Sequence, residues 1–179
     1  MNRAWVSSTT IFALVSMGCV SEYHGGAQTA AQSGGPITQS ATLGGSLAWG
    51  DSRGAFGPVI EGSLGVDDRS GRASGSVLYG FEYSTYGGEP VSAERFALLA
   101  GWTGTTRAHD EAALIALRYG HAWVLGVSED GRGITSLSLD PTLGAVIVDP
   151  GYGRRSGVMI GLGLTLRYEH FSEWIFRHL

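Results

Sequence analysis

The sequence predicts an all-β fold, an antiparallel up-and-down barrel of about eight strands. Three observations lead to this prediction. From about residue 40 onward, apolar residues alternate with small or polar ones at a period of two, as in strands with two different faces. Turn clusters rich in glycine, serine and aspartate separate the alternating runs at fairly regular spacing. Between about residue 40 and residue 172, no segment shows the period of about 3.6 residues that is typical of a helix.

Residues 1–18 have the layout of a secretory signal peptide. A positively charged start is followed by an apolar run over residues 11–15 and then by small residues up to Cys19. The residues just before Cys19 resemble the lipobox of bacterial lipoproteins, in which the cysteine after the cleavage site becomes the lipidated first residue. That family favours leucine where this chain has Ser16. The resemblance implies a lipid anchor on Cys19, and the alternative is an ordinary signal peptide after which Cys19 has no special role.

The segment 19–38 is rich in glycine, alanine, serine, glutamine and threonine, and it shows neither the helical nor the strand period. Such a composition is typical of flexible linkers, so we expect a tether between the N-terminal segment and the folded domain. The barrel is then expected to span residues 39–171, and residues 172–179 to form a short C-terminal tail.

Several runs within residues 39–171 alternate clearly enough to be interpreted as strands. The last is the clearest, because Leu162, Leu164 and Leu166 share one face, opposite Gly163 and Thr165. In chain order the runs cover residues 43–50, 59–66, 76–83, 96–103, 111–128, 134–149 and 160–169.

The composition of the polar face indicates which way the apolar face points. A water-facing surface normally carries about a quarter or more charged residues, lysine included. Here that face consists mainly of glycine, serine, alanine and threonine, and the chain contains no lysine. Small residues with isolated charges suit the crowded lumen of a narrow barrel, where acids and arginines can pair. We therefore expect a charge network in the lumen, formed by Glu61, Glu82, Arg118, Arg167 and Glu169.

Aromatic residues lie on the apolar face, or in phase with it, near the ends of several runs. In membrane barrels, tryptophan and tyrosine gather at this depth and form girdles at the two interfaces. The alternative is that these side chains pack the core of a soluble protein. The predicted girdle residues are Trp49, Tyr83, Trp102, Trp123 and Tyr168.

Over residues 40–171, this pattern resembles the small eight-stranded outer-membrane barrels of Gram-negative bacteria, the class that includes OmpX and the transmembrane domain of OmpA. The run 161–171 looks like the terminal strand of such proteins, which usually ends in an aromatic residue, here Phe171. Glu169 occupies a position where the family has an apolar residue. The resemblance implies that the apolar face contacts lipid.

Membrane barrels of this type have even numbers of strands, so one of the two longest runs should break into two. Asp140-Pro141 is the favoured turn, because proline cannot donate a hydrogen bond within a ladder. A break near Gly120-His121 is the second choice. If the tether lies in the periplasm, loops 51–54 and 84–93 face the outside.

Composition excludes several classes of function. A net charge of −4 without lysine argues against nucleic-acid binding. One cysteine excludes a disulfide framework and a cysteine-based zinc site. The five histidines lack the spacing of metal-binding motifs, and no Gly-x-Ser-x-Gly elbow is present. We therefore expect no catalytic activity, no metal and no cofactor.

These observations favour a non-enzymatic, exported barrel protein of the outer membrane, with a structural, scaffolding or envelope-complex interaction role. Its expected partners are outer-membrane lipid, other envelope proteins and a second copy of the chain. The alternative is a lipid-tethered, soluble periplasmic barrel that binds an apolar ligand as a lipocalin does. A third class, a barrel enzyme acting on lipids, requires a histidine, a serine and an acid together, for which His170 and Ser172 are the nearest candidates.

Overall fold

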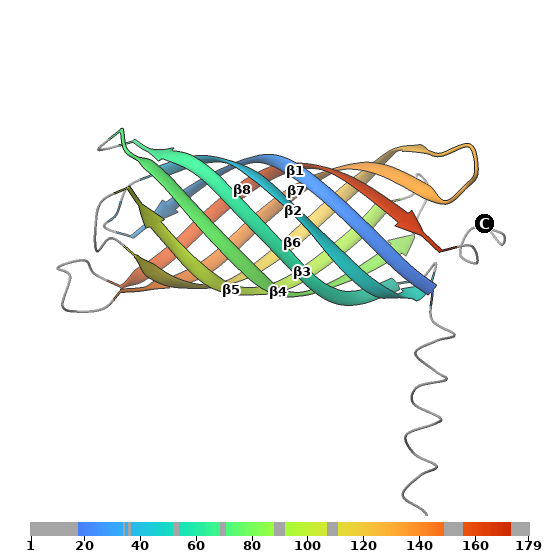
Figure 1. Cartoon of the computed structure of the whole chain (residues 1–179), viewed down its shortest axis with the longest axis horizontal. Helices are drawn as coiled ribbons and strands as arrows, with labels where there is room; N and C mark the ends of the chain where they lie inside the picture. The colour runs from blue at the N-terminus through green and yellow to red at the C-terminus, as the bar shows by residue number, and fades with distance from the viewer. Residues whose placement is uncertain are drawn as a thin grey trace, which may run out of the picture.

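The chain folds into a closed barrel of eight antiparallel strands (Figure 1). The computed structural model describes residues 18–33, 35, 37–51, 54–68, 71–87, 92–106, 111–148 and 156–172. Each strand pairs with the next along the chain, and β1 pairs with β8 to close the sheet, which confirms the predicted all-β, up-and-down barrel. Within the described ranges, no helix is long and apolar enough to cross a membrane. The strands are β1 (Gly18–Gln32), β2 (Ile37–Asp51), β3 (Gly54–Asp67), β4 (Ala73–Gly87), β5 (Ser92–Thr105), β6 (Ala112–Val127), β7 (Gly133–Ile147) and β8 (Gly157–Phe171).

The segment predicted as a flexible tether, 19–38, is largely a strand. β1 pairs with β2 from Gly18 to Ala31 and with β8 from Val20 to Gln32. Its outward positions carry mostly small residues, and Tyr23 is the large exposed side chain that β1 contributes. Without aliphatic residues on one face the period of two is hard to see, so the prediction of a tether is wrong for this segment. β1 is a strand because its backbone pairs with both neighbours, and its side-chain pattern does not reveal this pairing.

The barrel has eight strands, but neither of the predicted breaks occurs. β6 runs without interruption through Gly120-His121, and β7 through Asp140-Pro141. Pro141 pairs with Leu162 of β8, whereas the ladder from β7 to β6 is interrupted at Asp140 and Pro141. The missing N–H of proline therefore weakens the pairing on one side only, and the strand continues. The eighth strand comes from the N-terminal segment instead.

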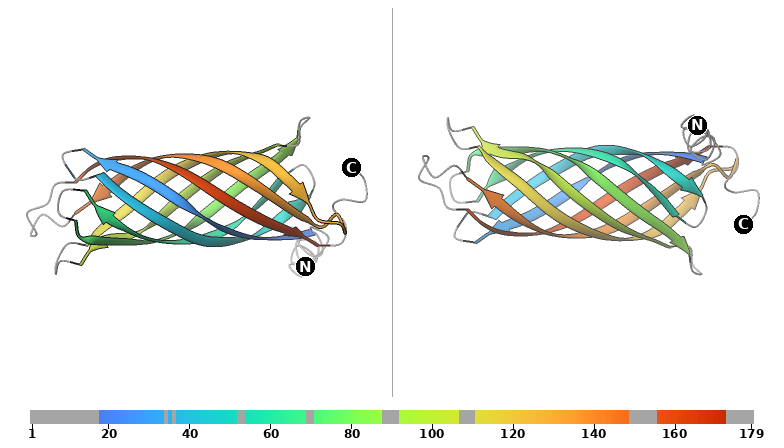
Figure 2. Two further views of the ribbon diagram at one scale, coloured as in Figure 1. Left: turned by 90° about the horizontal axis from the view of Figure 1, so that it is seen from above. Right: turned by 90° about the horizontal axis from the view of Figure 1, so that it is seen from below.

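β1 begins and β8 ends at the same end of the barrel (Figure 2). We call it the terminal end and the opposite one the distal end. The extra strand reverses the direction expected for every later strand, so loops 51–54 and 84–93 join strands at the terminal end. The expectation that they lie on the side away from the N-terminal segment is therefore wrong. The longest connection, between Ile147 and Gly157, is distal.

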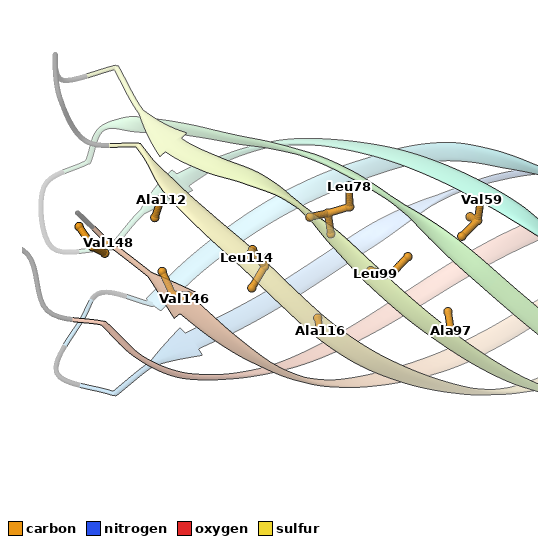
Figure 3. Packing of buried hydrophobic residues seen from close by; sticks show 9 residues of the cluster. All are labelled: Val59, Leu78, Ala97, Leu99, Ala112, Leu114, Ala116, Val146 and Val148. Atoms are coloured by element: carbon orange, nitrogen blue, oxygen red, sulfur yellow. The ribbon is translucent and has the colours of Figure 1, made fainter. Parts of the chain in front are cut away.

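Side chains fill the lumen in successive layers. Along β7, Ile134 belongs to an apolar cluster near the terminal end, Asp140 to a polar layer, and Val146 to a second apolar cluster. The first cluster, here called the terminal cluster, contains Val20, Ala55, Ile134 and Phe171. The distal cluster, shown in Figure 3, contains Val59, Leu78, Ala97, Leu99, Ala112, Leu114, Ala116, Val146 and Val148.

Candidate functional site

The outward face of the barrel is apolar around its circumference. Leu64 on β3 is 77% exposed, and Leu43 on the neighbouring β2 is 75% exposed. Exposed apolar patches on soluble monomers rarely exceed a few hundred Å². Here large exposed apolar side chains occur on all eight strands, with Tyr23 as the contribution of β1, and such a surface is typical of a barrel whose wall faces an apolar medium. On β8 alone the band consists of Val158, Ile160, Leu162, Leu164, Leu166 and Tyr168.

Aromatic side chains mark the edge of this band toward the terminal end. On β4 the outward face changes from Tyr83 to Thr85, and on β5 it changes from Phe96 to Glu94. The structure places all five predicted girdle residues on the outward face with exposed side chains, and their role at a membrane interface stays a prediction. Trp49, Tyr83, Trp123 and Tyr168 lie toward the terminal end, and Trp102 lies toward the distal end.

A buried ionic layer crosses the lumen between the two apolar clusters. Each of its acids and bases is less than a tenth exposed, and together they come from seven of the eight strands. Burying charges is tolerable only when they are paired and hydrogen-bonded. All five predicted lumen residues belong to this layer. Its members are Glu22, His24, Glu61, Glu82, Arg95, Arg118, Asp140, Arg167 and Glu169.

Arg167 connects acids from three other strands. Its Nη1 donates to Glu22 at 2.5 Å and to Glu82 at 3.4 Å. Its Nη2 donates to Asp140 at 3.5 Å, and the hydroxyl of Ser138 donates to the second oxygen of Asp140. A planar guanidinium suits this position because its donors point in several fixed directions. One side chain on β8 therefore ties β1, β4 and β7 together.

Arg118 and His24 converge on Glu61. Nη1 of Arg118 donates to Glu61 at 2.5 Å, and Nη2 of Arg118 lies 3.7 Å from Glu82. The ring of His24 lies between two carboxylates, with Nδ1 2.8 Å from Glu22 and Nε2 3.2 Å from Glu61. This arrangement links β1, β3, β4 and β6 through hydrogen bonds and ion pairs.

Arg95 reaches across the lumen from β5 to the junction of β1 and β8. Its Nη2 lies 2.8 Å from Glu169, and its Nε lies 3.8 Å from both Glu22 and Glu82. Glu22 and Glu169 are directly opposed partners in the β1–β8 ladder. The hydroxyl of Tyr86 also donates to Glu169, at 2.9 Å. Arg95 therefore neutralises two like charges that would otherwise face each other.

Sequence reasoning missed four members of the layer. Glu22 and His24 lie in the segment taken for a tether, Arg95 follows a segment taken for a loop, and Asp140 was assigned to a turn. A usable signal was present in the phase of alternation. Arg95 continues the inward positions of Ala97 and Leu99, and Glu22 and His24 have the two-residue spacing of a shared strand face.

The hollows of the molecule argue against a ligand-binding interior. A cavity of about 60 Å³ lies inside the distal mouth and is lined by polar residues that include Thr38, Asp67 and Thr105. A much larger apolar hollow, about 830 Å³, lies on the outer wall. The lipocalin-like alternative requires leucine, phenylalanine and tyrosine to line an interior cavity. Most of these side chains point outward, and those that point inward, such as Leu99 and Phe171, pack in the two apolar clusters.

The remaining predicted features are placed as follows. Cys19 is the second residue of β1 and pairs with Trp49 of β2. Of the predicted signal peptide, Gly18 is the first residue of β1, and residues 1–17 lie outside the described residues. Lipidation of Cys19 stays a prediction. His170 points outward at the end of β8, and the aromatic Phe171 beside it points into the lumen. Of the predicted tail 172–179, only Ser172 is described.

Outside the strands, Asp130 in the turn between β6 and β7 has a lowered pKa. The hydroxyl of Ser128 and the backbone amide of Arg132 donate hydrogen bonds to Asp130 and lower the pKa of its carboxyl. This is a local turn interaction at the terminal end. Among the described residues, no group of three or more histidines, cysteines and acids is suited to hold a metal ion.

No protein-family model and no curated protein matches the chain. Among solved structures, the chain is similar to the outer membrane protein OprG from Pseudomonas aeruginosa, with 9% sequence identity and a TM-score of 0.45. The similarity covers 88% of this chain and 97% of that one. The architecture assigned to this chain, a closed eight-stranded antiparallel barrel, follows from its own strand pairing.

Proposed function

We propose that the protein is an integral outer-membrane β-barrel with a structural role, and that it is neither an enzyme nor a general pore. The observation that carries this proposal is the inversion of polarity, with apolar side chains outside and charged side chains inside. A soluble barrel has the opposite arrangement, with its polar face toward the surrounding water and its apolar face inside.

The dimensions of the band support a membrane. A transmembrane strand tilted by about 45° needs about 9–11 residues to cross the hydrocarbon core. On β8, the outward apolar positions extend from Val158 to Tyr168, which are about 11 residues. Beyond Tyr168, β8 continues for three more residues to Phe171 at the terminal end.

The filled lumen supports a scaffolding role. The terminal cluster, the ionic layer and the distal cluster follow one another along the axis and leave no described passage for solutes. In an eight-stranded barrel the interior is just wide enough for side chains to fill it. The partners in this proposal are the surrounding lipid and neighbouring envelope proteins or a second copy, met through the wall or the strand connections.

A pair of matched substitutions on β8 tests the proposal. Leu164→Arg places a charge within the apolar band and should cost about 2–4 kcal/mol, whereas His170→Arg, beyond the girdle, should cost about 0–1 kcal/mol. The measurement is equilibrium unfolding in lipid vesicles, followed by the shift in gel mobility between folded and boiled protein. Equal stability of the two variants would refute a membrane location for Leu164.

Cell fractionation separates the proposal from its rival. The full chain should be recovered with the outer membrane after washing with high salt and carbonate. Recovery in the soluble fraction would contradict the integral barrel, whatever the state of Cys19.

A further inference from the structure

A polar cluster on the outer wall lies apart from the ionic layer. Glu94 on β5 and His121 on β6 are ladder partners, and Oε1 of Glu94 lies 2.6 Å from Nδ1 of His121. The hydroxyl of Tyr119 donates to the second oxygen of Glu94. The side chains of His121 and Glu94 are 32% and 37% exposed, so the pair is accessible from outside the barrel.

On β5 the cluster lies at the edge of the apolar band, because Ser92 and Glu94 begin the outward face of this strand and the exposed Phe96 follows directly. On β6 the apolar positions continue past His121 to Trp123, Leu125 and Val127. Among the strand side chains that the structure describes, the outward-facing acids and bases are Glu94, His121 and His170. Glu94 and His121 therefore lie among the aromatic side chains of the predicted girdle, which gather at the depth of the membrane interface.

The chemistry of the cluster suits an ammonium group. An ionised carboxylate offers about four acceptor positions, of which Tyr119 and His121 occupy one each. If Nδ1 of His121 donates to Glu94, Nε2 remains an acceptor. The ring of Trp123 packs against His121 with centroids 4.7 Å apart, and aromatic faces beside a carboxylate attract cations further. A headgroup that carries only negative charge, with no ammonium to contact Glu94, would be repelled.

An apolar hollow begins at the same place. The hollow of about 830 Å³ extends over the outer wall from Phe56 on β3 to Ile160 on β8, and its lining includes Tyr119, Phe96, Leu98 and Leu117. A headgroup at Glu94 would therefore lie at the edge of this apolar surface, next to Phe96 and Tyr119. The polar cluster and the hollow are separate observations that favour the same kind of ligand, one with a cationic head and an apolar tail.

We propose that Glu94, Tyr119, His121 and Trp123 bind the ammonium headgroup of a phosphatidylethanolamine molecule, whose acyl chains lie in the hollow over Phe96, Leu98 and Leu117. This inference rests on the proposed membrane location. It adds a defined lipid site to a wall that otherwise contacts lipid without distinction.

The test is native mass spectrometry of the full-length, detergent-solubilised barrel with three lipids of identical acyl chains. Phosphatidylethanolamine should be retained best, phosphatidylcholine less well because it lacks N–H donors, and phosphatidylglycerol least because it has no cation. Glu94→Gln should reduce retention of phosphatidylethanolamine about three- to fivefold, the effect of about one exposed charge contact. Tyr119→Phe, which removes the hydroxyl that orients the carboxylate, should give a smaller loss.

Glu111→Gln is the matched control, because Glu111 is an exposed acid just before β6 at the distal end. It should leave lipid retention unchanged. Equal retention of all three lipids, or unchanged retention by Glu94→Gln with a folded, heat-modifiable band, would overturn the lipid site alone. A wild-type chain that is not recovered with membranes would instead overturn the proposed function.

Discussion

Replacing Arg95 by methionine should weaken the barrel at the β1–β8 junction. Arg95 is 1% exposed and lies 2.8 Å from Glu169. Methionine keeps an unbranched apolar stem out to about the position of Nε and removes the charged guanidinium. Glu22 keeps its bonds to Arg167 and His24, so Glu169 is the main group left without a cation. Removing one partner of a buried ion pair typically costs about 3–5 kcal/mol. Since Glu169 is the main acid that loses its partner, we expect Arg95→Met to lower the free energy of unfolding by one such amount.

A second substitution identifies the group that causes the loss. Glu169→Gln removes the opposing charge but keeps an oxygen that can accept from Tyr86. The double variant Arg95→Met/Glu169→Gln should therefore recover about 1–3 kcal/mol relative to Arg95→Met alone. Arg72→Met, at an exposed position before β4, is the control and should cost no more than about 1 kcal/mol.

The assay is denaturant unfolding in vesicles of constant composition, measured by the loss of the heat-modifiable band. Each variant is compared at the same protein and lipid concentration, since the folded state depends on both. A cost below about 1 kcal/mol for Arg95→Met would refute the argument that Arg95 compensates a buried acid. Equal instability of the single and double variants would show that Glu169 is not the group left unpaired.

Two further predictions follow from the wall and the N-terminal strand. Gly80→Ala should destabilise the barrel by about 1–3 kcal/mol, because the added Cβ would collide with the carbonyl oxygen of Leu98. The control is Gly126→Ala, which should cost much less because nothing lies within 4 Å of the added Cβ. Equal unfolding midpoints of the two variants would contradict this packing. Cys19→Ala should leave the protein in the outer-membrane fraction, because the barrel wall alone holds it there; release into the soluble fraction would show that a lipid anchor, and not the wall, retains it.

Much of the fold could be predicted from the sequence because most strands carry large apolar residues on one face. The alternation of leucine with glycine and threonine predicts both that β8 is a strand and which of its faces points outward. β1 offers no such contrast, since Gly25, Ala27 and Ala31 stand at outward positions and resemble linker residues. Its strand conformation depends on pairing with β2 and β8, which sequence-local patterns do not contain.

The residues of the ionic layer also divide into some that the sequence predicts and others that it does not. Glu61, Glu82 and Arg167 could be predicted because each interrupts a run of small residues on the inward face. Asp140 could not, because Pro141 beside it is a strong turn signal, and only the three-dimensional ladder shows that β7 continues past it. Which acid pairs with which arginine depends on the closed barrel, because the partners lie on strands that are distant in sequence.

Closure of the sheet also constrains how the protein is made. The hydrogen bond between Arg167 and Glu22 joins positions 145 residues apart, so the last strand to be synthesised completes the surroundings of the first. Contacts between such distant residues form late, because chain entropy opposes them. An unclosed sheet would present its arginines to hydrocarbon, at a cost of about 2–4 kcal/mol for each one near the bilayer midplane. Under the proposed membrane location, insertion one strand at a time is therefore disfavoured, and we expect the chain to enter the bilayer in a largely curled state, with its two edges already close together.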